Sequence, residues 1–514
     1  MRFIGSLWLA AASVALGLHW PAATPASKHA KYGGTLRVEL SVASVSLDPR
    51  AWKTGSVAAA ENAKLATLLY DRLVTLDEYG RFQPALALEW SHDANSKTWQ
   101  FKLRPGVKFS DGSLLAPKHV VAALQPLLPN GLQVGPTEGG IQIRATHSTP
   151  DLLEQLASGR YFIFRALPEN AFLGTGPFVL AESSVAAPSE ANPSAVKPAR
   201  LKFRANEDTW TGRPFVDAID VTLGNPPLRQ ILNLQVGRAE IIDIPPDLVH
   251  KALQENLRVW NPAPDTLLAL RLDDAQPDTS DPRLREALDL ALDRDTMANV
   301  LLQRQAFPAA TLLPQWLSGY AFLFGAPMNL DLAKQLRAAL PANMARENDP
   351  VRLRVDAVGD LMKLLGERVA VNARQANISV QVVSRSASSS SATAASSAGI
   401  GMHLFAWHYD SFSPGAELQA LAQHLHSEWK VELADEPLDA EGLFAEERRL
   451  LDDRQILPLV LLPQYVGIAP NVRNWSAGPS GTWRLADVWL EVGEGAAASP
   501  DAMAGRTVRP GVHP

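Results

Sequence analysis

A stretch of chain near residue 100 alternates apolar with polar residues and is then broken by turn residues. Trp99, Phe101 and Leu103 are each separated by one polar residue, and a Pro-Gly pair follows directly. Alternation with a period of two is typical of a half-buried strand, and Pro-Gly is typical of a turn. The pattern predicts a hairpin that continues into the alternating residues Val107 and Phe109. Because Pro117 then opens an apolar helical pattern, we expect strands and helices to be mixed along the chain.

The same stretch carries a series of spaced residues that resembles a known family. It runs from Leu69 to Gly112 and contains Leu-Tyr-Asp-x-Leu-Val, Pro-x-Leu-Ala, Trp, and Trp-x-Phe-x-Leu-Arg-x-Gly-Val-x-Phe-x-Asp-Gly. This order is similar to the signature of family 5 of the ABC-transporter solute-binding proteins, which includes periplasmic peptide-, dipeptide- and nickel-binding proteins. The chain departs from the family just afterwards, with Ala116 in place of a capping Thr and His119 in place of an Asp. Residues 125–170 are also shorter and less similar.

The resemblance implies an α/β fold of two lobes, the type II periplasmic-binding-protein fold in its three-domain variant, with discontinuous mixed sheets. Other stretches agree with it, such as Gly-Thr-Gly-Pro-Phe at 174–178 and Asn-x-x-x-Trp-x-Gly-x-Pro at 206–214. The apolar run 457–465 is expected to pair back onto the first domain. The expected division is a signal peptide at 1–30, domain I at 31–55, 173–265 and 457–490, domain II at 56–172, domain III at 266–456, and a disordered tail at 491–514.

Composition limits the class of protein. A chain of 514 residues is long enough for two or three domains with sizeable cores. Its net charge of -6 gives no reason to expect nucleic acid or an anionic membrane as a partner. The chain has no cysteine, which excludes disulfides, thiolate metal sites and a lipid-anchored N-terminal Cys.

The first 30 residues resemble an export signal. Arg2 supplies a positive start, residues 3–18 form an apolar run, and small residues at 22–26 offer cleavage sites. The run is too short for a comfortable membrane span. We therefore expect a periplasmic protein that is cleaved and not lipidated, with an uncleaved anchor as the open alternative.

A second apolar run ends in a Trp and leads to a single carboxylate. Residues 404–414 are Leu-Phe-Ala-Trp-His-Tyr-Asp-Ser-Phe-Ser-Pro. Alternation puts Phe405 and Trp407 on one face of a strand and Asp410 near its end, where a side chain can project into a cleft. The stretch is similar to the family's Trp-x-x-Asp-x-x-x-Pro segment, which implies that Asp410 receives the α-ammonium group of a peptide. The plainer interpretation is that Trp407 belongs to the core and Asp410 caps a turn.

The resemblance also implies how an extended peptide would be held. One strand edge near Ser44 and Val45 and another near Ala406 to His408 would sandwich the peptide and pair mainly with its backbone. Asp410 would then fix the register. The candidate ligand-binding residues are Asp410, Trp407, His408, Ala406, Ser44 and Val45.

Catalytic and metal-binding motifs are absent from the sequence. It has no nucleophile elbow, no His-Glu-x-x-His helix and no phosphate loop, so we expect neither an enzyme nor a cofactor. The best metal candidate is the pair His424 and His426 with Glu428 close by. That segment has a helical pattern, in which residues two apart diverge, so no metal site is expected.

The sequence therefore predicts a monomeric solute-binding component of an ABC importer. It would capture peptides by hinge closure of two lobes and deliver them to ABC permease subunits in the inner membrane. Two other interpretations stay open. The ligand could be a different solute, such as an oligosaccharide stacked on Trp residues or a nickel chelate. The fold could instead serve as a periplasmic chaperone or interaction module without a transport role.

Overall fold

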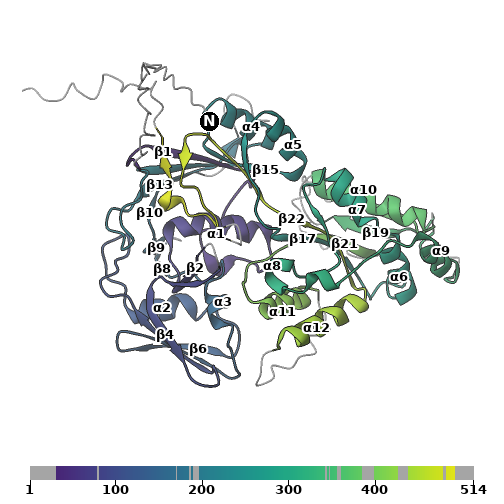
Figure 1. Ribbon diagram of the computed structural model, residues 1–514, viewed down its shortest axis with the longest axis horizontal. Coiled ribbons are helices and arrows are strands. Elements are labelled where there is room, and N and C mark those ends of the chain that lie inside the picture. The colour runs from purple at the N-terminus through teal and green to yellow at the C-terminus, as the bar shows by residue number, and fades with distance from the viewer. Residues whose placement is uncertain are drawn as a thin grey trace, which may run out of the picture.

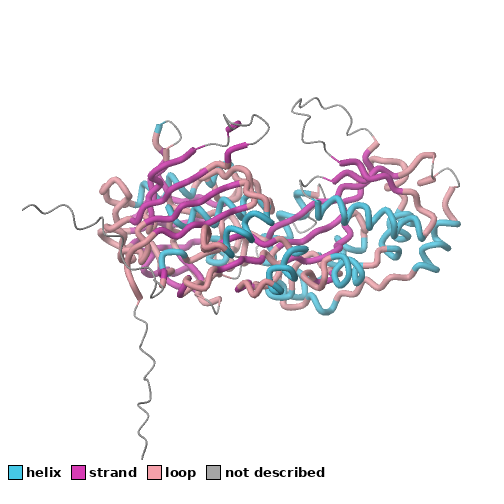
Figure 2. The backbone as a smooth tube through the Cα atoms, turned by 90° about the horizontal axis from the view of Figure 1, so that it is seen from above, coloured by secondary structure: helices cyan, strands magenta, loops and turns pink. Residues whose placement is uncertain are grey.

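The computed structural model consists of two lobes that lie next to each other, with β17 (Thr266–Leu272) and β22 (Ile456–Leu462) near their contact (Figure 1). The structure describes residues 30–77, 80–168, 171–184, 187–188, 196–341, 344–346, 348–355, 360–384, 399–425, 438–478 and 482–491. Seen from above, strands and helices gather in two adjoining bodies (Figure 2). The arrangement of several mixed sheets confirms the predicted two-lobed α/β fold.

The first lobe is built on a seven-stranded sheet. In spatial order its strands are β10 (Phe178–Ser184), β13 (Arg200–Ala205), β14 (Ala218–Leu223), β1 (Thr35–Leu40), β15 (Ile241–Ile244), β23 (Tyr465–Ile468) and β16 (Arg258–Trp260). Its helices are α1 (Val57–Leu69), α4 (Pro227–Gln235) and α5 (Pro246–Gln254). Most of α1 is buried, including the charged residues Glu61 and Lys64. A helix buried on nearly all sides must pair such charges internally.

Three of the family-like segments meet at one buried carboxylate. Asp71 accepts hydrogen bonds from the Thr175 hydroxyl and the Trp210 indole N–H, each at 2.7 Å. Burial raises the pKa of Asp71, and these two donors oppose that rise. The Arg104 guanidinium lies 4.5 Å from the Trp210 ring centroid. These contacts therefore hold the three segments together, and the role of Trp210 among them is packing.

A four-stranded antiparallel sheet forms the smaller domain of this lobe. Its strands are β4 (Ala87–His92), β5 (Thr98–Leu103), β7 (Gly140–Ala145) and β6 (Leu132–Thr137), in that order. Trp99, Phe101 and Leu103 are buried on one face, as their alternation predicts. The predicted hairpin across Pro105 and Gly106 is wrong, because β4 and β7 take both edges of β5. The neighbouring elements are β2 (Val74–Leu76), β3 (Phe82–Pro84), α2 (Pro117–Leu124), α3 (Leu152–Leu156), β8 (Phe164–Ala166) and β9 (Phe172–Gly174).

The helix α2 begins without the usual side-chain cap. Ala116 stands at the N-cap position, and the His119 imidazole accepts the Ala116 N–H at 3.1 Å. Ala116 and His119 both depart from the family pattern. Together they still form the half of a capping box in which the third helical residue accepts the N–H of the N-cap residue.

The second lobe is built on a six-stranded sheet with a separate core cluster on each face. Its strands are β18 (Phe307–Pro308), β22, β17, β21 (Ile400–His408), β19 (Val351–Val355) and β20 (Val380–Ser384). One face is covered by α6 (Pro282–Ala291) and α10 (Asp360–Gln375), the other by α11 (Pro414–His424) and α12 (Ala440–Asp452). The other elements are α7 (Arg294–Thr296), η3 (Met297–Leu301), α8 (Gln315–Ser318), η4 (Ala321–Leu323) and α9 (Leu330–Ala338). Short pieces elsewhere are η1 (Pro49–Ala51), β11 (Ala187–Pro188), β12 (Val196–Lys197), β24 (Val472–Arg473), η5 (Leu485–Asp487) and β25 (Trp489–Leu490).

The two crossings between the lobes lie side by side. The Asp265 N–H donates to the Leu462 carbonyl at 3.0 Å, just before β17 and at the end of β22. All of β22 is buried and pairs with β17 and β18, so the predicted pairing of 457–465 with the first domain is wrong for 457–462. Only from Tyr465 does the chain pair with the first lobe, through β23. Paired crossings of this kind can act as a hinge.

Several predicted segments lie outside the described residues. They are the signal peptide up to residue 29, the tail from 492, His426 and Glu428. A search for membrane-spanning helices in the part of the chain that the structure describes finds none of sufficient length and hydropathy.

Candidate functional site

The strand β21 carries the predicted ligand segment into the middle of the second lobe's sheet. It pairs with β17 from Met402 to His408, whereas β19 pairs with it only as far as Leu404. Phe405 and Trp407 belong to the same core cluster, as expected for residues on one face. Trp407 is only 2% exposed, so its role in this structure is packing. Its contact with a ligand stays a prediction.

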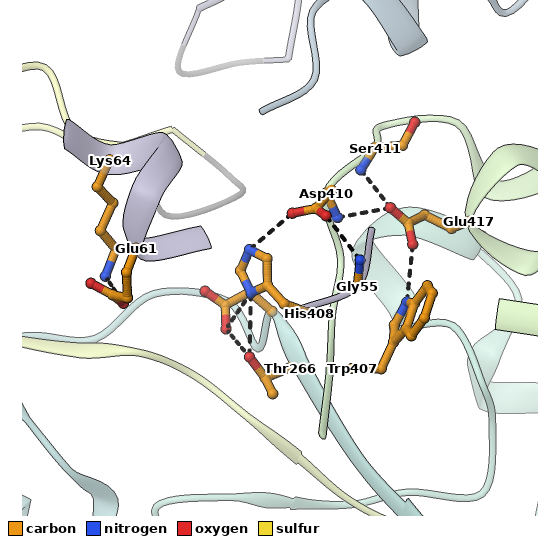
Figure 3. Close-up of polar contacts among 10 residues, drawn as sticks. Gly55, Glu61, Lys64, Thr266, Trp407, His408, Asp410, Ser411 and Glu417 are labelled. Carbon is orange, nitrogen blue, oxygen red and sulfur yellow. Dashed lines mark hydrogen bonds and ion pairs between the residues drawn. The ribbon is translucent and has the colours of Figure 1, made fainter. Parts of the chain in front are cut away.

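A buried glutamate organises the chain around Asp410. One Glu417 oxygen accepts the N–H groups of Asp410 and Ser411, at 2.7 and 2.5 Å. The other accepts the Trp407 indole N–H at 3.1 Å (Figure 3). Burial, together with the charge of Asp410, raises the pKa of Glu417 to about 8. Three donors on one carboxylate hold Asp410 in a fixed position relative to Trp407.

Glu417 is not among the residues predicted from the sequence, although its position on a helix could have indicated it. Glu417 lies four residues before Leu421 and therefore on the apolar face of α11. A carboxylate on a core-facing stripe needs internal donors, and the ends of strands and helices supply them. A charged residue on the apolar face of a helix that follows a candidate ligand strand is therefore a candidate site residue.

Asp410 itself lies where the two lobes touch. Its Oδ2 atom accepts the Gly55 N–H at 3.0 Å, and the Gly55 carbonyl accepts the His408 N–H at 2.8 Å. The Asp410 carbonyl accepts the Gly159 N–H at 3.2 Å. Burial raises the pKa of Asp410 to about 6, while the Gly55 N–H and the charge of Arg160 favour the ionised form. The Asp410 carboxylate is therefore mainly ionised at pH 7.

His408 lies between Asp410 and a second group of buried charges. Its two ring nitrogens are 3.9 Å from Asp410 Oδ1 and from Asp265 Oδ1 (Figure 3). Burial and the charge of Lys64 lower the pKa of His408 to about 3. The imidazole is consequently neutral at pH 7, and these two contacts are not ion pairs.

The second group of charges surrounds Lys64. The Lys64 Nζ atom lies 2.7 Å from Glu61 Oε1, and both side chains are buried. Burial lowers the pKa of Lys64, but the carboxylates of Glu61 and Asp243 outweigh it, so Lys64 stays charged. Burial raises the pKa of Asp243 and of Asp265 to about 7 in each case, and Glu61 adds to both rises.

Carboxylates outnumber cations at the lobe contact. Glu61, Asp243, Asp265 and Asp410 are opposed by the buried Lys64. One oxygen each of Glu61 and Asp265 has no hydrogen-bond partner within the described residues. These two free acceptor oxygens favour a ligand that brings N–H donors.

A small pocket adjoins Asp410. Its cavity volume is about 10 Å³. The pocket is lined by Asp410 of the second lobe and by several residues of the first lobe, namely Trp52, Lys53, Thr54, Ala59, Ala63, Gly159 and Arg160. The pocket therefore combines one carboxylate with two side chains of the opposite charge, Lys53 and Arg160.

The other predicted site residues are placed less centrally. β1 ends at Leu40, so Ser44 and Val45 lie in irregular chain after the strand. Ser44 is exposed, whereas Val45 is half-buried against the core of the first lobe. Ala406 is half-buried on β21 beyond the reach of β19. Their contact with a ligand stays a prediction.

Of the metal candidate, only His424 lies in the described part of the chain. His424 ends α11 and packs against the rings of Phe405 and Trp407, at 5.4 and 5.3 Å between centroids. No group of three or more His, Cys, Asp or Glu residues suited to a metal ion occurs among the residues that the structure describes.

Residues 81–428 match the profile of the bacterial extracellular solute-binding proteins, family 5 Middle. The matched range covers most of the 514 residues. The chain belongs to this family. By the family's description, its members are extracellular solute-binding proteins.

Individual relatives of this solute-binding protein include nickel and peptide binders. The nickel-binding periplasmic protein of Escherichia coli K12 is 24% identical over 482 residues, which cover 81% of this chain and 88% of that protein. The probable di/tripeptide-binding protein 5 of Pseudomonas aeruginosa UCBPP-PA14 is 24% identical over 302 residues, covering 50% of this chain and 55% of that protein. The solved structure of DppA from Helicobacter pylori, in complex with the peptide STSA, has a TM-score of 0.72 at 16% identity and covers 90% of this chain and 99% of its own.

Proposed function

We propose that this solute-binding protein is the extracytoplasmic component of an ABC importer and that it captures peptides. The observation that carries the proposal is Asp410, a buried and mainly ionised carboxylate at the contact of the two lobes. An α-ammonium group placed there would make charge-assisted hydrogen bonds, worth about 1.5–3 kcal/mol.

Hinge motion is the proposed route to the site. The crossings before β17 and after β22 are adjacent, so a few residues there can absorb a rotation of one lobe against the other. Opening would expose Asp410, and closure over the ligand would give the permease a distinct shape to recognise. ABC permease subunits of the inner membrane are the proposed partners of a monomeric protein.

A nickel complex is the second candidate because nickel-binding proteins occur among the relatives. The described residues offer no cluster of metal ligands, so the nickel would have to arrive already chelated. A chelate whose metal-bound amines carry N–H groups, such as nickel-histidine, could still donate hydrogen bonds to Asp410.

We expect free peptides to bind and N-acetylated peptides to bind poorly. Acetylation removes the ammonium charge and leaves Asp410 buried without a cation, so trialanine should bind about 10- to 100-fold more tightly than N-acetyl-trialanine. Isothermal titration calorimetry measures both, with nickel-histidine in a parallel titration. Equal affinities for the two peptides, or binding of nickel-histidine alone, would contradict the peptide assignment.

The Escherichia coli relative is periplasmic by name, and we propose the same location here, without a lipid anchor. The basis is the apolar run at residues 3–18 and the lack of any cysteine. N-terminal sequencing of the protein from the periplasmic fraction should begin between residues 22 and 31. A chain that still starts at Met1 and sediments with membranes would count against this address.

A further inference from the structure

The carboxylate proposed to bind the ligand is already occupied by the chain itself. Gly55 donates its N–H to Asp410 Oδ2 and accepts the His408 N–H, so it bonds on both sides like a paired residue of a strand. Gly55 and Asp410 are 355 positions apart in the sequence. Figure 3 shows the Gly55 nitrogen pointing at Asp410 from the first lobe. A backbone N–H thus stands where the ammonium of a ligand would be placed.

The residues around Gly55 hold it in this position. We call residues 52–56 the occluding segment. The Arg160 guanidinium donates to the Thr54 hydroxyl at 2.5 Å, and the Trp52 indole N–H donates to the Ser46 carbonyl at 2.9 Å. Both anchors come from the first lobe, so the occluding segment moves with that lobe.

Glycine is required at position 55 by two independent constraints. Its φ of +73° lies in the left-handed region, which side chains disfavour. A Cβ at this position would lie 2.3 Å from atoms of the Trp407 ring, far inside contact distance. The segment therefore reaches Asp410 only because residue 55 has no side chain.

The occluding segment also limits the space beside Asp410. The end of β21 beyond Leu404 is free of β19, and Gly55 pairs with it at His408. The adjoining pocket has a cavity volume of only about 10 Å³. Ligand sites for small molecules usually have about 300–1,000 Å³, so a peptide and the occluding segment cannot share this place.

We propose that residues 52–56 act as a tethered competitor, which the α-ammonium of a ligand must displace from Asp410 before it can bind. This inference rests on the proposed function and specifies how the same site is regulated. The observed affinity then equals the intrinsic affinity reduced by the fraction of molecules whose segment is displaced. A competitor of this kind leaves Asp410 when the ligand binds, and the ligand cannot bind while the segment stays in place. A loop that merely packs would stay in place when the ligand binds.

Hydrogen exchange at Gly55 tests the displacement directly. Mass spectrometry of the peptic fragment that contains residues 52–56 should show protection in the ligand-free protein, since the amide is buried and bonded to Asp410. Saturating trialanine should make this fragment exchange faster, although ligands usually slow exchange. Slower or unchanged exchange at saturation would overturn the proposal.

A substitution tests the competition. Gly55→Ala should expel the segment from the Trp407 ring and raise the affinity for trialanine by about 10- to 100-fold. Gly319→Ala is the matched control, because Gly319 has a φ of +74° and a Cβ there would meet nothing within 4 Å. The control carries the same backbone strain and should leave the affinity unchanged. Equal or weaker binding by folded Gly55→Ala would overturn the proposal.

A milder variant covers the case in which Gly55→Ala does not fold. Thr54→Val removes the acceptor of Arg160 without adding a clash, and it should give a smaller gain in affinity and faster exchange of the segment without ligand. The two proposals fail in different ways. Binding of trialanine by the native protein while Gly55 stays protected refutes the competitor alone. If neither the native protein nor these variants bind trialanine, the peptide assignment fails and the competitor falls with it.

Discussion

Asp410→Asn is expected to weaken trialanine binding by roughly 150- to 5,000-fold. The amide keeps the shape of the side chain and can still accept the Gly55 N–H, but it removes the only carboxylate that lines the pocket. Loss of one partner from a buried ion pair costs about 3–5 kcal/mol, which corresponds to that range. Calorimetry on the folded variant measures the change.

The control for this prediction is Asp453→Asn. The Asp453 side chain is 55% exposed and pairs with Arg449 at the surface, so its replacement should leave ligand affinity unchanged. If Asp410→Asn bound trialanine as tightly as this control, the ligand would not be held by its ammonium group.

The affinity of the native protein should also depend on pH. Only the ionised form of Asp410 attracts an ammonium group, and burial has raised its pKa to about 6. Affinity should therefore be highest near pH 7 and fall as the pH drops through 6. It should also fall above about pH 8, where the α-amino group of the peptide loses its proton. Asp410→Asn should lack the fall on the acid side, which separates titration of Asp410 from a general effect of acid.

Lys64→Met is expected to lower the free energy of unfolding by about 3–5 kcal/mol at pH 8. Lys64 is the cation that neutralises Glu61, Asp243 and Asp265 in the interior, and each of these would then be buried without its counter-charge. Breaking such a buried pair by removing one partner is strongly destabilising. Denaturant unfolding followed by tryptophan fluorescence measures the loss.

Two comparisons make this prediction specific. Lys102→Met breaks an exposed pair, with Lys102 and Glu89 at 63% and 71% exposure, and should change stability by less than about 1 kcal/mol. The raised pKa values of Asp243 and Asp265, both about 7, mean that the folded protein takes up protons between pH 7 and 4 that the unfolded chain does not. Stability therefore rises as the pH falls through 7, and the cost of Lys64→Met should be smaller at pH 5 than at pH 8. An equal cost at both values would contradict a role for these carboxylates.

Local patterns were sufficient to predict much of the fold. Alternation predicted the buried face of β5, and Pro117 opens α2 as its position before an apolar helical pattern indicates. The spaced motif predicted the family, which the profile match confirms. Each of these features depends on residues a few positions apart, where periodicity and capping act directly.

Long-range pairing was decided only by the tertiary structure. The strand β22 is apolar throughout, as a buried strand of either lobe could be, so its composition does not indicate its lobe. It belongs to the second lobe because it pairs with the edge of β17. In the same way, the sequence placed Asp410 at the end of a strand, but the bond from Gly55 spans 355 positions. Burial of a carboxylate is tolerated only where donors converge on it, and which donors converge depends on how the lobes close rather than on any nearby residue. The sequence by itself therefore indicated a carboxylate at the end of a strand, and the contact of the two lobes decided which groups surround that carboxylate.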